Sequence, residues 1–167
     1  LEFRALLLDY PRLNLRNVAF RNAGGTHFEE VPDGWGIGRA PDITHGLALA
    51  DFDGDGDLDA VANRLNEPAG VFRNGSDAPR VAVRLLGAGA NTQGIGSVIR
   101  LIDLREDSGA PAPQRKEILA GGTYLSGSEA MAVFAATSDS LRLEILWRSG
   151  QRQVVDGGRP NRLYEVT

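Results

Sequence analysis

Hydrophobic and polar residues alternate with a period of two through much of the second half of the chain. The pattern runs through residues 80–85, and it is clearest in residues 141–148, where the apolar positions are Leu141, Leu143, Ile145 and Trp147. Such alternation is typical of antiparallel strands with one buried face and one solvated face. Ser149–Gly150 predicts a tight turn into a strand over 151–155, and 107–113 predicts a hairpin tip. We therefore expect a small antiparallel β-sandwich.

The first half contains a weak internal repeat. Asn-Val-Ala-Phe-Arg-Asn at 17–22 recurs as Ala-Gly-Val-Phe-Arg-Asn at 69–74, and short strand-like segments cover 28–31, 46–50 and 60–62. About four short strands per repeat is the size of a β-propeller blade. One blade cannot bury both of its faces, so a second surface must cover it.

The pattern changes around residues 76–79, and neither half contains a convincing helix. We predict an all-β chain with two parts, an incomplete propeller-type blade over 1–76 and a β-domain over 77–167. Residues 1–10 are expected to add a strand to the sheet of the blade, because the run Leu6–Leu8 is too apolar for a free edge.

An acidic loop joins two of the apolar segments in the first half. It follows the pattern D-x-D-x-D-G-x-x-D, with aspartates at positions 1, 3, 5 and 9. Calcium prefers six to eight oxygen ligands, which carboxylates at alternate positions can supply when the chain curls. At position 7 the backbone carbonyl is the expected ligand, with the side chain pointing outward. The predicted metal residues are Asp51, Asp53, Asp55, Asp57 and Asp59.

Two glycines allow this loop to curl. Gly56 lies where a calcium loop makes its sharp turn, and Gly54 gives further freedom. Without a cation, two carboxylates ~5 Å apart repel by about 3 kcal/mol at a dielectric constant of ~20. A solvated acidic turn is the alternative interpretation, and magnesium fits less well because it keeps several waters. Position 12 is Ala62, so the site is strand–loop–strand and differs from the helix–loop–helix type.

Other candidate residues carry weaker signals. His45 precedes the acidic loop and could be a ligand or an acid–base group, although a surface role for it and for His27 is the simpler interpretation. Ser126 lacks the G-x-S-x-G pattern of a nucleophile elbow, so no catalytic residue is assigned. The segment 121–126 is interpreted either as a ligand or partner surface or as a β-bulge with Tyr124 packed at a strand end.

Composition narrows the function classes. The chain has no cysteine, which excludes disulfides and zinc–thiolate sites. Its net charge is −4, and it has no basic stripe for nucleic acid and no apolar run long enough to span a membrane. No signal peptide is recognisable in its first residues. Trp35 and Trp147 are expected to pack in the core or between blades.

Two family resemblances follow from these motifs. Residues 46–61 with 70–74 resemble an FG-GAP/VCBS propeller repeat, and 17–22 with 28–31 resemble the end of the preceding repeat. The β-domain, 79–167, resembles the ASPIC/UnbV domain of cartilage-acidic-protein-like and enediyne-cluster proteins. The stretches that carry this second resemblance are Gly94–Gly96, Ala120–Ser126 and Leu143–Gly150. The sequence departs from the family at Ala132–Thr137, where a His-Phe-Gly-Leu-Gly-like run is usual.

The resemblance implies calcium in the repeat loop, an extracellular or extracytoplasmic location and no known catalytic activity. The leading hypothesis is a secreted, calcium-binding, non-catalytic adhesion or protein-interaction module from the C-terminal end of a β-propeller protein. Its partner would be a protein or a glycan, and a homodimer could cover the exposed blade. The alternatives are an accessory protein of natural-product (enediyne-type) biosynthesis or small-ligand binding and, on weaker grounds, a hydrolase.

Overall fold

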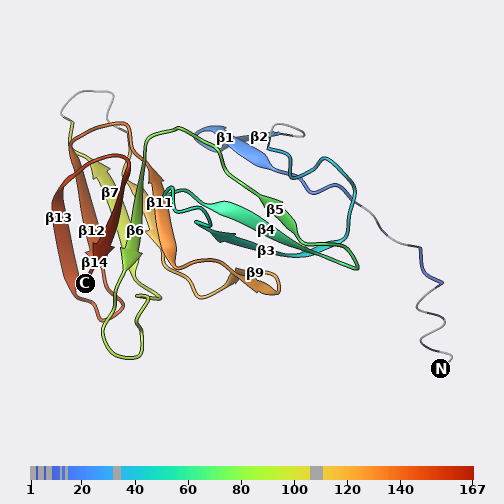
Figure 1. Cartoon of the computed structure of the whole chain (residues 1–167). Helices are drawn as coiled ribbons and strands as arrows, with labels where there is room; N and C mark the ends of the chain where they lie inside the picture. The colour runs from blue at the N-terminus through green and yellow to red at the C-terminus, as the bar shows by residue number, and fades with distance from the viewer. Residues whose placement is uncertain are drawn as a thin grey trace.

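The computed structural model describes residues 3, 6, 9–11, 13, 15–31, 35–105 and 111–167. Apart from Phe3 and Leu6, whose backbone is helical, the regular structure of this part is strand. A β-sandwich forms one part, and a thinner layer of shorter strands lies beside it (Figure 1). The all-β class predicted from the sequence is therefore confirmed.

The sandwich consists of two sheets. The three-stranded sheet has the order β11-β6-β14, and the four-stranded sheet has the order β13-β12-β7-β8. Their bounds are β6 Arg80–Leu85, β7 Val98–Asp103, β8 Gln114–Glu117, β11 Met131–Ala135, β12 Leu141–Leu146, β13 Arg152–Gly158 and β14 Arg162–Val166. All pairs are antiparallel except β6 with β14, which is parallel. The strand predicted over 141–148 ends two residues earlier, because the chain turns there and the Gly150 N–H bonds to the carbonyl of Trp147 (2.8 Å).

The core lies between these two sheets. The alternating apolar residues of the sequence point inward, and the largest fully buried side chains include Phe134, Leu85, Ile99, Leu141, Leu143, Ile145, Val81 and Val83. Burying one such side chain is worth roughly 1.5–3 kcal/mol. The sandwich thus has a continuous core of its own.

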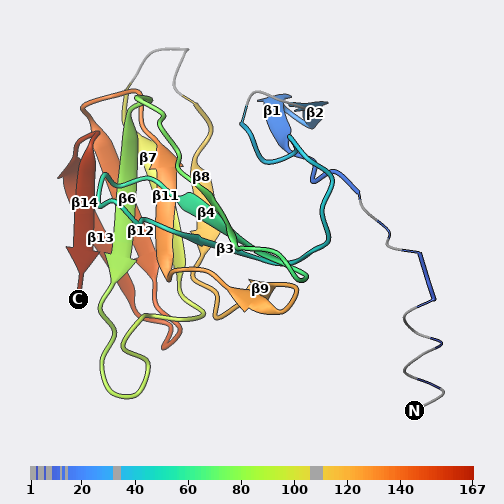
Figure 2. The same cartoon turned by 45° about the vertical axis from the view of Figure 1, so that its right-hand side comes forward.

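The strands between residues 20 and 72, which we call the blade after the sequence prediction, form a three-stranded antiparallel sheet, β3-β4-β5, and a separate hairpin, β1-β2. Their bounds are β1 Phe20–Gly24, β2 His27–Glu30, β3 Thr44–Ala50, β4 Asp59–Arg64 and β5 Gly70–Phe72. Strands were expected close to these positions. Every residue of β1 and β2 is exposed, and the hairpin stands clear of the other sheets (Figure 2). The blade therefore leaves apolar surface without cover.

The free edge of β3 lies against the segment between β8 and β11, which includes the short strands β9 (Gly122–Thr123) and β10 (Ser126–Gly127). The Ser126 hydroxyl donates to the carbonyl of Leu47 (2.6 Å) and accepts from its N–H (3.2 Å). The N–H of Leu49 donates to the Ser128 hydroxyl (3.1 Å), and the Leu49 carbonyl accepts from the N–H of Glu129 (2.8 Å). Side-chain hydroxyls thus take the place of a neighbouring strand. We call this contact between β3 and residues 123–129 the seam.

Three expectations need correction or lie outside the described residues. Tyr124 does not pack at a strand end, because it lies at the tip of the β9–β10 hairpin, where its exposed fraction is 75%. The N-terminal strand is wrong for the residues described there, since Phe3 and Leu6 are helical and exposed and Asp9 lies in a turn. The hairpin tip predicted over 107–113 lies mostly outside the described residues.

Candidate metal centre

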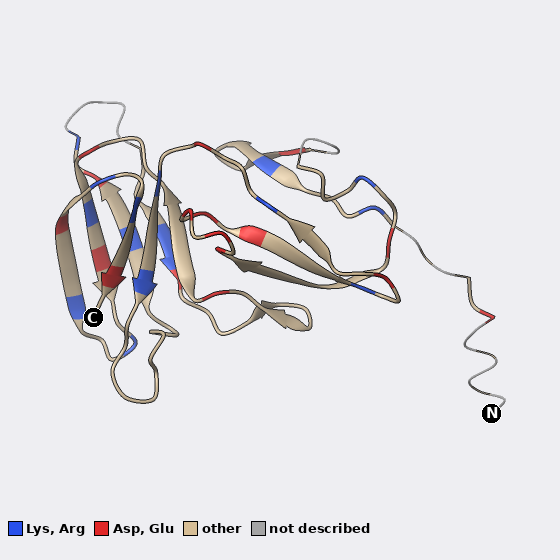
Figure 3. Ribbon diagram, in the orientation of Figure 1, with Lys and Arg blue, Asp and Glu red and all other residues tan. Residues whose placement is uncertain are grey.

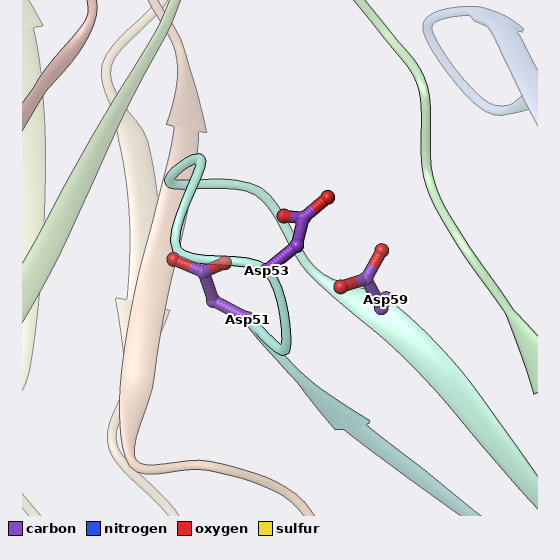
Figure 4. A group of neighbouring side chains, drawn as sticks. All are labelled: Asp51, Asp53 and Asp59. Carbon is purple, nitrogen blue, oxygen red and sulfur yellow. The ribbon is translucent and has the colours of Figure 1, made fainter.

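The acidic loop connects β3 to β4 and brings three of its five aspartates together. Oxygens of Asp51, Asp53 and Asp59 all lie within 4.8 Å of one another (Figure 4). Acidic residues are concentrated at this end of β3 and β4, whereas Lys and Arg are spread over both parts of the chain (Figure 3). Strand ends position Asp51 and Asp59, and the loop positions Asp53.

Asp51 organises the first part of the loop. Its carboxylate accepts hydrogen bonds from the N–H groups of Gly54 (2.8 Å), Asp55 (3.1 Å) and Gly56 (3.0 Å). Gly54 and Gly56 have φ angles of 78° and 88°, which glycine adopts at little steric cost. The curl expected at Gly56 is therefore present. An ionised carboxylate has about four lone-pair sites, so Asp51 retains acceptor capacity for a cation.

Asp59 joins three parts of the blade and is almost fully buried, with 3% of its surface exposed. One of its oxygens accepts from the N–H of Phe52 (3.0 Å) and the other from the N–H of Asn74 (2.7 Å). The residue thus holds the start of the loop and the chain after β5 around one carboxylate.

Arginines partly neutralise the other aspartates. Arg73 Nε lies 2.6 Å from Asp53 Oδ2. Arg80, at the start of β6, places its guanidinium Nη2 3.0 Å from Asp55 Oδ1. The Arg80 guanidinium also donates to the backbone carbonyl of Asp55 (2.9 Å). Two arginines against five carboxylates leave an excess of negative charge in the loop.

Asp57 is the residue that differs most from expectation. Its side chain was expected to point outward, but only 4% of it is exposed. Neither carboxylate oxygen has a hydrogen-bond partner in the described part of the chain. Burial raises the pKa of Asp57, and the nearby Asp55 raises it further, while Arg80 acts in the opposite direction. The outward orientation was wrong because the Arg80 guanidinium, 3.4 Å from Asp57 Oδ2, attracts this side chain inward.

These donors fit a hard divalent cation. All of the converging atoms are oxygens, which is the ligand set of calcium. The buried carboxylate of Asp57 accepts no hydrogen bond from the described residues and adds negative charge beside these ligands, with Arg80 as its ion-pair partner. Asp51, Asp53 and Asp59 would hold the ion, and Asp55 and Asp57 would contribute charge beside it.

The other candidates for chemistry lie elsewhere. His45 is exposed on β3, and His27 is exposed beside Glu29 (3.9 Å). The Ser126 hydroxyl is occupied by the backbone of Leu47 at the seam. Trp35 has an exposed fraction of 52%, whereas Trp147 packs against the sandwich core as expected.

Sequence reasoning missed the residues that support the loop. Arg73 and Asn74 belong to the repeated Phe-Arg-Asn motif, so their recurrence was a usable signal. Arg80 and Glu129 gave no local signal, because each reaches the loop from the sandwich. Glu129 accepts from the N–H of Asp51 (3.0 Å) and pairs with Arg84, and this hydrogen bond raises the pKa of the Arg84 guanidinium.

Among the residues that the structure describes, no helix combines the length and apolar character needed to cross a membrane. Comparison with curated proteins and with solved structures gives no match. Residues 87–167 match the family model described as ASPIC and UnbV, which is not known as a catalytic family. The match begins in the loop after β6 and includes the rest of the sandwich. The ASPIC/UnbV domain predicted for the second half of the chain is therefore confirmed over residues 87–167.

Proposed function

We propose that the chain is a calcium-stabilised, non-catalytic interaction module from the C-terminal end of a β-propeller protein. The observation that carries this proposal is the convergence of Asp51, Asp53 and Asp59 within 4.8 Å. The carboxylate of Asp57 supports it, because this buried group accepts no hydrogen bond from the described residues and has only the Arg80 guanidinium, 3.4 Å away, as an opposite charge.

The blade geometry supports the FG-GAP/VCBS part of the proposal. The two copies of the repeated motif end in equivalent turns: Asn22 accepts from the N–H of Gly24 (2.7 Å), and Asn74 accepts from the N–H of Ser76 (3.2 Å). Large apolar side chains remain exposed over the blade, namely Phe20, Phe28, Trp35, Phe52 and Val71. In a complete propeller a neighbouring blade would cover such a surface, and a second copy of the chain could do so for this fragment.

An extracellular or extracytoplasmic location is part of the same proposal. Extracellular calcium modules bind at about 10⁻⁴–10⁻³ M, so millimolar calcium would fill about half or more of such sites. The hydrolase alternative receives no support from Ser126, whose hydroxyl is committed to the backbone of β3. Small-ligand binding is favoured by one observation, a cavity at the end of the sandwich.

A calcium titration followed by thermal unfolding tests the function. Millimolar calcium should stabilise the protein by about 1–2 kcal/mol, which raises Tm by roughly 2–8 °C for a chain of this size. Asp53→Asn should remove most of this rise, while Asp139→Asn, an exposed aspartate of the sandwich, should retain it. An identical Tm in calcium and in EDTA for the natural chain would refute the calcium site.

A further inference from the structure

A cavity of about 620 Å³ lies at one end of the sandwich. The loop after β6, the β12–β13 turn and the end of β14 meet there (Figures 1 and 2). Its volume falls within the roughly 300–1,000 Å³ typical of ligand sites. Two sequence motifs that the calcium loop does not use, 94–96 and 147–150, come together at this cavity although about fifty residues separate them. The cavity is therefore a candidate binding site distinct from the metal centre.

Hydrogen bonds fix the frame of the cavity. The indole N–H of Trp147 donates to Gln153 Oε1 (2.9 Å), and Gln153 Nε2 donates to the carbonyl of Thr167 (3.1 Å). The side-chain N–H of Asn91 donates to the carbonyl of Ile95 (2.9 Å), and Asn91 Oδ1 accepts from the N–H of Ile95 (2.8 Å). Trp147 is half-buried against the sandwich core, so the aromatic ring is held in place before any ligand binds. A preorganised site loses less entropy on binding.

Arg148 lines the same cavity as Trp147. Its stem lies along Gly96, where an added Cβ would be 3.2 Å from Arg148 Cδ, and Gly96 has a φ angle of 82°. The guanidinium makes no hydrogen bond or ion pair with any residue that the structure describes, and Arg148 is exposed. The lining side chains include no acid, and the side-chain amide of Gln151 is also without a partner among the described residues.

We propose that this cavity binds a carboxylate-bearing saccharide of the hexuronate type. An indole ring offers an apolar face to a sugar ring, and a guanidinium forms bidentate hydrogen bonds with a carboxylate. The free amide of Gln151 and the hydroxyl of Ser149 can bond to sugar hydroxyls. The lining contains the Arg148 guanidinium and no acidic side chain, which disfavours positively charged ligands. The inference rests on the proposed interaction function and names an acidic glycan as the partner.

Calorimetric titration of the full chain with trigalacturonate in EDTA tests the inference. A neutral trisaccharide of the same linkage is the ligand control, and we expect it to bind at least ~10-fold more weakly. Arg148→Gln should lower the affinity for trigalacturonate at least ~10-fold, a loss of about 1.4 kcal/mol. Arg148→Lys should restore only part of it, because an ammonium cannot form the bidentate pair. Arg159→Gln, the same charge change at the opposite end of β13, should bind as the natural chain does.

Several results would overturn the inference: no binding at millimolar ligand, equal binding of the two trisaccharides, or unchanged affinity in Arg148→Gln. Binding that appears only with calcium would also overturn it, because the ligand would then belong to the Asp51–Asp59 loop. A chain that keeps its calcium-dependent Tm but fails to bind trigalacturonate would leave the proposed function intact. Thermal unfolding of each variant distinguishes lost binding from lost folding.

Discussion

The seam between β3 and the sandwich provides the sharpest test of how the two parts of the chain are joined. The double substitution Ser126→Ala and Ser128→Ala removes the hydroxyls that accept the N–H groups of Leu47 and Leu49. The carbonyl of Leu47 keeps Thr123 as a donor (2.9 Å). The substitution therefore leaves two partly buried N–H groups without partners.

The magnitude follows from these two groups. Leaving one buried donor unsatisfied costs about 1–3 kcal/mol, and partial exposure places each of these groups near the lower limit. We expect the double variant to lose about 2 kcal/mol in total, or roughly 4–8 °C in Tm. Amide hydrogen exchange at Leu47 and Leu49 should accelerate selectively, because both groups lose their acceptors.

The matched control is Ser140→Ala, which removes an exposed hydroxyl of the sandwich. It should leave both Tm and the exchange of the β3 amides unchanged. If the double variant keeps full stability and the Leu47 and Leu49 amides remain protected, the hydroxyls do not act as the neighbouring strand of β3. The assignment of the seam would then be wrong.

Three further predictions concern the rest of the chain. Hydrogen bonds from Arg105 hold the pKa of Asp103 below its ordinary value, so this pair stabilises the protein above the ordinary aspartate pKa and is lost as pH falls through the lowered value. Asp103→Asn should therefore lower Tm at pH 7 and flatten its fall below pH 4, and an unchanged acid profile would contradict this. Gly70→Ala should lower Tm, because an added Cβ would lie 2.7 Å from the Arg64 guanidinium and would displace it from its ion pair with the buried Asp42 (2.9 Å); Gly75→Ala, which has open space, is the control. When residues 1–76 and 77–167 are produced as separate proteins, 77–167 should show a cooperative thermal unfolding transition and 1–76 should show none. Circular dichroism melts of the two proteins measure this.

Local patterns allowed much of the fold to be predicted. Alternation identified β6 and β12, and the spacing of aspartates and glycines identified the loop, because both features depend on neighbours in the sequence. The parallel pairing of β6 with β14 has no such local signature, since it joins residues about eighty positions apart. The same reason explains why the segment 121–126, which contains Ser126 of the seam, was interpreted as a ligand or partner surface or a bulge. Their partners lie in β3.

The convergence of Asp51, Asp53 and Asp59 was predictable from their spacing, but the electrostatics of the loop were less so. The pattern identified the aspartates, whereas the orientation of Asp57 depends on Arg80, which the sandwich supplies. Likewise, the cavity at the end of the sandwich forms only when Gly94 and Trp147 meet, and nothing in either motif alone indicates that meeting. Local sequence patterns therefore do not predict the contribution of charged residues, such as Arg80, that reach the loop from a distant part of the chain.

Asp57 links the stability of the loop to its proposed ion. Its buried carboxylate has no hydrogen-bond partner among the described residues, so it destabilises the protein when no cation is bound. Asp57→Asn keeps the shape and removes the charge, and it should therefore raise Tm in EDTA. The same variant should show a smaller rise with calcium, because less negative charge faces the ion. Differential scanning calorimetry in both conditions measures the two effects, with Asp139→Asn as the control. A lower Tm in EDTA would mean that Arg80 compensates the carboxylate fully and that Asp57 gives no support to a bound cation.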